Sequence, residues 1–124
     1  MKTKICTDIK QSKKLAELGL DIETADMTYY PIQSIENNVH YHLFAYKEVV
    51  GIFAWSLSRL LVIIRDWQCI WLGANDVASW RCEFNLGSGK HYVTDPTMDP
   101  LDAAYNCLVW LIENGKINPK NITI

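Results

Sequence analysis

The alternation of hydrophobic and polar residues is most regular between residues 77 and 84. Apolar and polar side chains alternate there, and the apolar set is Ala78, Trp80, Cys82 and Phe84. A two-residue period predicts a β-strand with one packed face and one face in water. Antiparallel sheets permit this arrangement, because only one of their faces needs to be covered.

Four further stretches are rich in β-branched and aromatic residues, which favours strands at residues 27–35, 39–50, 67–73 and 91–94. The pair Asn37-Asn38 separates the first two stretches. Asparagine tolerates positive φ angles, so this pair predicts a tight hairpin turn. Pro31 has no N–H to donate, which predicts that the first of these strands lies at a sheet edge or a bulge.

Two helices are predicted from apolar stripes that follow capping residues. In residues 57–64, leucine and isoleucine recur at helical spacing after Ser56, which can cap the helix. The β-branched end of this stretch would also suit a strand. An earlier helix is predicted to begin at Thr7 or Asp8 and to end at Gly19, which can adopt the left-handed conformation.

The last predicted helix begins at Asp99, with Pro100 in the first helical position, and ends at Gly115. Apolar residues cover most of its circumference. Such a helix is usually the central helix of its domain. The alternative is that its extra apolar flank packs against a second subunit.

These elements predict one α+β domain spanning residues 1–124. A chain of 124 residues fits a single domain, and 49% apolar with 21% charged residues is a globular composition. We expect two layers: an antiparallel or mixed sheet of about five strands, with three helices packed mainly on one face.

Charge and cysteine content indicate a cytoplasmic protein. The net charge of −2 gives no general attraction for nucleic acid or an anionic membrane. No apolar stretch follows the N-terminal lysines, so we expect no signal peptide, and no segment has the roughly 20 apolar residues of a membrane span. We therefore expect reduced thiols, mostly in the core, at all four cysteines: Cys6, Cys69, Cys82 and Cys107.

His40 and His42 are the candidate metal ligands. They are two residues apart on a predicted strand, so both rings project from one face. With a carboxylate from Asp95 or Asp99 they would suit a small metal-dependent enzyme or binder. The only other histidine is His91, and a polar sheet face explains the pair without a metal, so we predict no cofactor.

Three aspartates, Asp95, Asp99 and Asp102, crowd the start of the last helix. Clustered carboxylates could hold Mg²⁺ or act as an acid–base pair. Helix capping is the favoured interpretation, because Asp99 occupies the cap and Asp102 the third helical position.

Five lysines lie near the start of the chain: Lys2, Lys4, Lys10, Lys13 and Lys14. They raise the alternative of nucleic-acid binding through the first helix. A solvated helix face is the favoured interpretation, because recognition surfaces usually combine arginine with stacking aromatic rings.

Tryptophans are the candidate partner-binding residues. Trp67 and Trp71 lie on a predicted strand that is apolar on both faces, and Trp110 lies on the wide apolar flank of the last helix. Such a strand is either covered on both sides or partly exposed at a partner surface, where aromatic anchors are enriched. Burial within the monomer is the alternative.

Common catalytic motifs are missing. The sequence has no P-loop, no Gly-x-Gly-x-x-Gly, no His-Glu-x-x-His and no Gly-x-Ser-x-Gly. The missing motifs therefore favour a protein without catalytic activity.

Three stretches, ICTDIKQSKKLAELGLDIETADM, AWSLSRLL and DPLDAAYNCLVWLIENGKI, resemble a family of short uncharacterised proteins. Members of that family occur in phage-derived and mobile-element regions of bacterial genomes. The resemblance covers most of the chain and implies an accessory role in a bacterial cytoplasm.

The strand-strand-strand-helix order between Trp67 and Asn114 resembles HicB-like antitoxins, with Asp102-Ala103-Ala104 where that family has Glu-Ala. The functional hypothesis is thus a non-enzymatic accessory protein of phage or mobile-element origin. It would act through another protein or through self-association.

Overall fold

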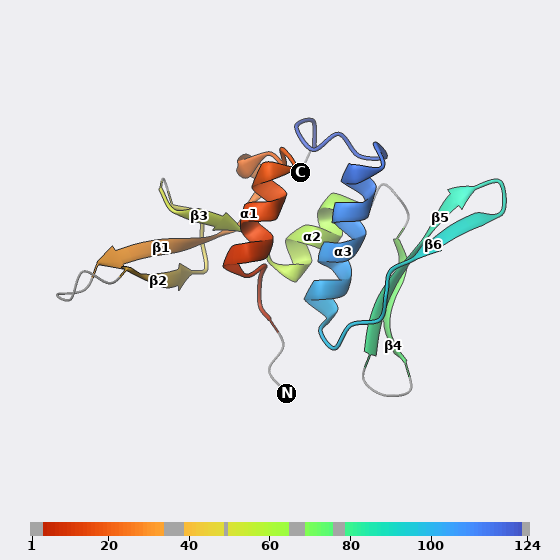
Figure 1. Ribbon diagram of the computed structural model, residues 1–124, viewed down its shortest axis with the longest axis horizontal. Helices are drawn as coiled ribbons and strands as arrows, with labels where there is room; N and C mark the ends of the chain where they lie inside the picture. The colour runs from red at the N-terminus through yellow and green to blue at the C-terminus, as the bar shows by residue number, and fades with distance from the viewer. Residues whose placement is uncertain (1–3, 34–38, 49, 65–68, 76–78, 123–124) are drawn as a thin grey trace.

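The structure, a computed structural model, describes residues 4–33, 39–48, 50–64, 69–75 and 79–122 of the chain (Figure 1). Within these ranges three α-helices and six strands form, which confirms the predicted α+β class. Every pairing between these strands is antiparallel. None of the helices found there is long and apolar enough to cross a membrane.

The first sheet has the strand order β2-β1-β3. Its strands are β1 (Met27–Gln33), β2 (Val39–Phe44) and β3 (Ile52–Ala54). β1 and β2 form the predicted hairpin, and the predicted turn at Asn37-Asn38 lies outside the described residues. The prediction of one strand over residues 39–50 is wrong in its second half, because the chain leaves the sheet after Phe44 and returns as β3.

The second sheet has the strand order β4-β5-β6. Its strands are β4 (Cys69–Asn75), β5 (Ser79–Gly87) and β6 (Lys90–Val93). Cys82 is fully buried, as the alternating pattern predicted. On the opposite face Arg81 and Glu83 form an ion pair with an N–O distance of 3.4 Å.

The helices lie between the two sheets (Figure 1). They are α1 (Ile9–Glu17), α2 (Leu57–Ile64) and α3 (Pro100–Glu113), with a 3-10 turn, η1 (Ile22–Thr24), after α1. The predicted single sheet of about five strands, with helices mainly on one face, is wrong. Strands pair only with close neighbours in the sequence, and α2 separates the two groups. Strands therefore pack on both sides of the helices: β3 against α1, and β4 and β5 against α3.

The ends of α1 form as predicted. Asp8 and Gln11 form a capping box, in which each side chain accepts a hydrogen bond from the backbone of the other residue. Gly19 has a φ angle of +90°, and the Leu20 N–H donates to the Leu15 carbonyl at 3.0 Å. This is the bond that closes a Schellman motif.

The other two helices also begin at predicted caps. The Ser56 hydroxyl accepts a hydrogen bond from the Arg59 N–H, and the Asp99 carboxylate accepts one from the Leu101 N–H at 2.8 Å. Gly115 ends α3 with a φ angle of +69°.

The main core lies where the three helices meet the sheets. Its fully buried side chains include Leu15, Trp55, Leu60, Ile64, Cys82, Leu101, Ala104, Cys107, Leu108 and Leu111. α3 supplies the largest share of this set, which confirms it as the central helix.

Pro31 lies where β1 has one neighbour. β3 pairs only with residues 27–29 of β1, so beyond Tyr29 that side of β1 is a sheet edge. The missing N–H of Pro31 therefore breaks no ladder there, and the edge prediction holds for the second half of β1.

Gly51 fixes the return of the chain into β3. Its φ angle is +135°, and an added Cβ would lie 2.6 Å from Thr28 Cγ2 and 2.7 Å from the Tyr29 carbonyl oxygen. Both the backbone angle and the close approach require glycine.

We predict that Gly51→Ala lowers the free energy of unfolding in urea by about 2–4 kcal/mol, from backbone strain and overpacking together. The matched control is Gly87→Ala, because Gly87 also has a positive φ angle but has open space around an added Cβ. It should lose only about 1 kcal/mol. Equal losses in the two variants would contradict the close contact at Gly51.

Candidate functional site

Exposed apolar side chains gather on the hairpin of β1 and β2, which projects away from the helices (Figure 1). We call this the hairpin surface. It has two faces: Tyr30, Ile32 and Phe44 lie on one, and Val39 and Tyr41 lie on the other. Tyr46 follows β2 and stacks on Phe44. Four of them, Ile32, Val39, Tyr41 and Tyr46, are 41%, 53%, 42% and 56% exposed. A cluster of exposed large apolar residues of this kind is typical of an interaction site.

Aromatic contacts order one side of the hairpin surface. Phe44 lies 6.0 Å from Tyr30 and 5.5 Å from Tyr46, measured between ring centroids, and the rings of Phe44 and Tyr46 are stacked. The strand register places His42 opposite Tyr30 and His40 opposite Ile32 on the same face. The rings of Tyr30, Phe44 and the two histidines therefore share one face of the hairpin across both strands.

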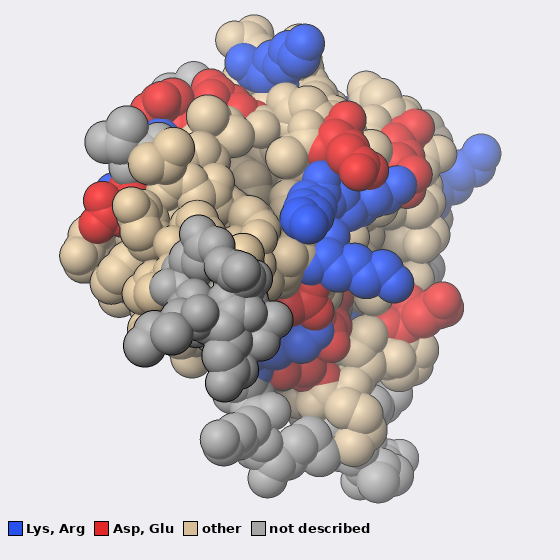
Figure 2. Space-filling model, turned by 60° about the vertical axis from the view of Figure 1, so that its left-hand side comes forward, with Lys and Arg blue, Asp and Glu red and all other residues tan. Residues whose placement is uncertain are grey.

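The hairpin surface is uncharged. Neither β1 nor β2 contains an aspartate, glutamate, lysine or arginine. The nearby Lys47 pairs with Glu23 at 3.0 Å and lies 5.3 Å from the Phe53 ring centre. In Figure 2 the left part of the visible face is mostly uncharged, whereas acidic and basic side chains lie next to one another from its centre to its right side.

A hollow of about 200 Å³ lies between α1, η1 and β3. Its lining is mainly apolar and includes Ile22, Ile52, Phe53 and Trp55. Ser12 also borders it, but its hydroxyl is hydrogen-bonded to Thr7 Oγ1 at 2.8 Å. The hollow is below the usual size of a cofactor pocket, so it suits a small apolar group at most.

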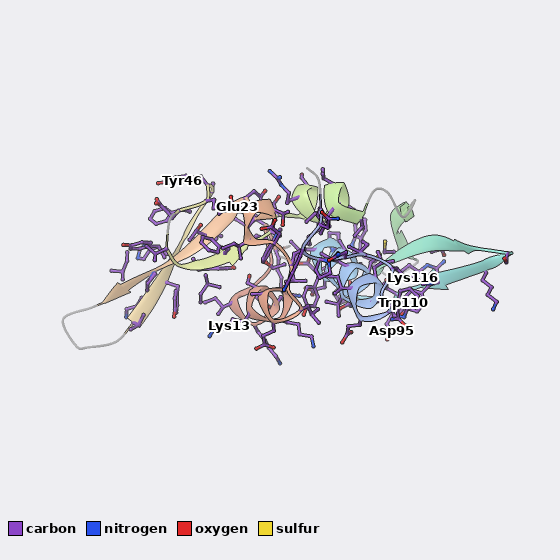
Figure 3. The ribbon with its side chains drawn as sticks, turned by 90° about the horizontal axis from the view of Figure 1, so that it is seen from above. Lys13, Glu23, Tyr46, Asp95, Trp110 and Lys116 are labelled. Atoms are coloured by element: carbon purple, nitrogen blue, oxygen red, sulfur yellow. The ribbon has the colours of Figure 1, made fainter. Side chains whose placement is uncertain are left out.

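The three predicted partner-binding tryptophans are not brought together by the structure as it is described. Trp67 lies outside the described residues, and of Trp71 only the backbone, in β4, is described. Trp110 is half-buried and stacks on Tyr92 of β6, with ring centroids 4.2 Å apart. In Figure 3 Trp110 lies on the side of the second sheet, away from Tyr46. Their role as partner-binding residues stays a prediction.

His40 and His42 share one exposed face of β2, as their spacing predicted. In Figure 3 Asp95 is seen on the second-sheet side of the helices, across from Tyr46. In the part of the chain that the structure describes, no three histidine, cysteine, aspartate or glutamate residues cluster as metal ligands would. Nothing there favours the metal-dependent alternative.

The other two predicted acidic residues bind the N-terminal segment. Asp99 is 8% exposed, and its second carboxylate oxygen accepts a hydrogen bond from the Lys4 N–H at 2.7 Å. Asp102 accepts hydrogen bonds from Lys4 Nζ at 2.8 Å and from Gln11 Nε2 at 2.7 Å. The capping interpretation is confirmed for Asp99, whereas Asp102 forms an ion pair between elements.

The lysines of the first helix do not form a single basic patch. Lys4 pairs with Asp8 and Asp102, and Lys14 lies 3.8 Å from Glu113. Lys10 and Lys13 are exposed, and Lys2 lies outside the described residues. Interleaved charges of both signs weaken the attraction for a phosphate backbone.

The ion pairs of Lys4 shift two pKa values. Burial alone would lower the pKa of Lys4, but hydrogen bonds to Asp102 and Asp8, and their charges, outweigh burial and raise it. Burial alone would raise the pKa of Asp8, but the Gln11 N–H and Lys4 outweigh burial and lower it. The cluster thus favours the charged form of both groups.

The described cysteine side chains, those of Cys6, Cys82 and Cys107, are buried thiols that form no disulfide with one another. Burial raises the pKa of the Cys6 thiol, although a hydrogen bond with the Tyr29 hydroxyl opposes that shift. A protonated, buried thiol is a poor nucleophile. The prediction of reduced core cysteines is confirmed for these three.

The sequence prediction missed the hairpin surface, although a signal was present. Val39, Tyr41 and Leu43 follow a two-residue period, and Phe44 and Tyr46 continue the alternate one. This is the doubly apolar pattern that drew attention to residues 67–72. Comparison of the chain with protein-family models, with curated proteins and with solved structures gave no match.

The pKa shifts predict how stability depends on pH. Asp8 stabilises the fold above its unfolded pKa of about 3.9, and this contribution is lost as pH falls through its lower folded pKa. Lys4 stabilises the fold below its unfolded pKa of about 10.4, and this contribution is lost as pH rises through its higher folded pKa. Lys4→Met should therefore lower the free energy of unfolding by up to about 1 kcal/mol between these limits.

Urea unfolding from about pH 3 to pH 11 measures this profile. The difference between Lys4→Met and wild type should shrink towards both ends of the range. Lys10→Met, at an exposed lysine of α1, should match wild type throughout. A pH-independent difference for Lys4→Met would contradict the ion-pair account.

Proposed function

We propose that this protein is a non-enzymatic accessory protein that binds an extended, uncharged segment of a protein chain along its β1–β2 hairpin. The observation that carries the proposal is the hairpin surface itself, a projecting pair of strands with exposed aromatic and aliphatic side chains. In β-strand addition, backbone hydrogen bonds supply affinity and side chains supply specificity.

The charge of the hairpin favours a particular kind of partner. An acidic or basic ligand would find no opposite charge on β1 or β2. An uncharged segment would lose no ionic solvation on binding and would cover the exposed rings. This argues for a protein segment over nucleic acid.

The residues that first suggested chemistry have structural partners. The Asp99 carboxylate caps α3 and binds the N-terminal backbone, Ser12 binds Thr7, and the Cys6 thiol is buried. Groups held in this way are not poised to act on a substrate, which supports a binding role. The sequence resemblance supports an accessory role encoded by a phage or mobile element.

The test is recovery of the native protein from its own host, with every bound chain identified and quantified. Tyr41→Lys places a charge on the hairpin surface and should reduce the bound chain about tenfold, as expected for loss of a central aromatic contact. Met98→Lys is the control, because Met98 is an apolar residue that is 56% exposed outside the first sheet. A bound chain recovered equally with both variants would contradict the proposal.

A further inference from the structure

The sheet edges differ in how they are protected. Pro31 protects the half of β1 that β3 leaves unpaired. β4 is bulged between Cys69 and Trp71, and β6 carries Lys90. β3 packs against α1. Bulges, lysines and covering helices are the usual devices that prevent strand addition.

β2 has none of these devices. Its register with β1 runs without a bulge from Val39 to Phe44, and the strand contains neither charge nor proline. In the described parts of the chain, no strand pairs with its outer edge. β2 is therefore the edge open to another strand.

Pro31 indicates which backbone groups of β2 point outward. It lies opposite Tyr41 and has no N–H, so the two residues cannot exchange a pair of hydrogen bonds. Two residues earlier, the Tyr29 carbonyl oxygen points towards β3, since it would lie 2.7 Å from a Cβ on Gly51. Tyr29 and Pro31 thus direct their backbone groups away from β2.

Along a strand the backbone N–H and C=O groups of successive residues point to alternate sides. The register with β1 therefore fixes the side to which each residue of β2 directs these groups. Tyr29 and Pro31 lie opposite Leu43 and Tyr41, and Val39 follows in the same phase. These three residues of β2 direct their N–H and C=O groups to the outer edge. His40 and His42 bond to β1 instead.

We infer that the segment bound at this edge is β2 of a second copy of the chain, an inference that rests on the proposed function. The two strands would run antiparallel around a twofold axis beside Tyr41. Each Tyr41 would face Tyr41 of the other copy, and each Val39 would face Leu43 of the other copy. Each of these three pairs would exchange two backbone hydrogen bonds, whereas the opposed His40 and His42 would exchange none.

The side chains of β2 are self-complementary in this register. Val39 and Leu43 are each two residues from Tyr41, so apolar residues meet apolar residues across the axis. Val39 and Tyr41, now 53% and 42% exposed, would be covered. On the other face His40 would meet His42 of the second copy, with no formal charge on the strand. A second copy therefore satisfies both the backbone and the side chains of this edge.

The projection of the hairpin gives a further reason for a second copy. Beyond residue 29 it is only two strands wide, and an isolated two-stranded ribbon is marginally stable in water. Edge pairing would widen it to four strands and give a continuous six-stranded sheet across the dimer.

The mass of the purified chain in solution tests this inference. Light scattering should give twice the monomer mass of 14.3 kDa. Tyr41→Pro removes one outward N–H and no bond to β1, so it should give the monomer mass with an unchanged circular dichroism spectrum. A dimer that persists in Tyr41→Pro would overturn the inference.

Cross-linking tests the register even if the proline variant fails to fold. In a Cys69→Ser background, Tyr41→Cys should form a disulfide-linked dimer on mild oxidation, because opposed Cα atoms lie within the roughly 4.4–6.8 Å that a disulfide spans. His42→Cys faces position 40 of the other copy and should cross-link at least tenfold more slowly, by the same geometry. Equal rates would overturn the inference.

Failure of the inference can be told from failure of the proposed function. A wild-type chain that is monomeric at all concentrations overturns the second copy as partner. If a different protein is then bound and is lost in Tyr41→Lys, the proposed function stands. If Tyr41→Lys reduces the amount of no bound chain, both the proposed function and the inference of a second copy fail.

Discussion

The structure depends on Trp55, which joins parts of the chain that are far apart in sequence. Its side chain is fully buried, and its indole N–H donates to Thr24 Oγ1 at 2.9 Å. Its backbone N–H donates to Thr7 Oγ1, and its carbonyl accepts from the Thr7 N–H. Because Trp55 connects β3 to α2, these bonds tie the N-terminal segment, η1 and the first sheet to the helices. Loss of one partner would leave a buried polar group unpaired.

This attachment explains why the hairpin is exposed. The first sheet reaches the helices at the beginning of β1 and the end of β3, where Met27 and Ala54 are buried with Cys6. The rest of β1 and β2 extends past them with apolar side chains on both faces (Figure 1). A sheet anchored at one end and apolar at the other suits a contact with a further strand. The exposure of the hairpin therefore follows from the way the first sheet is anchored.

Local signals in the sequence predicted the helices well. Asp8, Ser56 and Asp99 cap them as expected, because capping depends on residues within a few positions. Separation of the strands into two sheets was not predictable in this way, since it depends on which helix face each hairpin covers. The same limit applies to Asp102: its position suggested a cap, whereas its partner Lys4 lies far away in sequence. The hairpin surface was missed because exposed and buried apolar strands have the same composition.

Residue-resolved amide hydrogen exchange can test the proposed pairing of the outer edge of β2 with another strand, because neighbouring residues of β2 serve as internal controls. We expect the amides of Val39, Tyr41 and Leu43 to be protected at high protein concentration and to lose protection on dilution, while those of His40 and His42 stay protected by β1. Rapid exchange at Val39, Tyr41 and Leu43 at every concentration, with or without a bound chain, would contradict it.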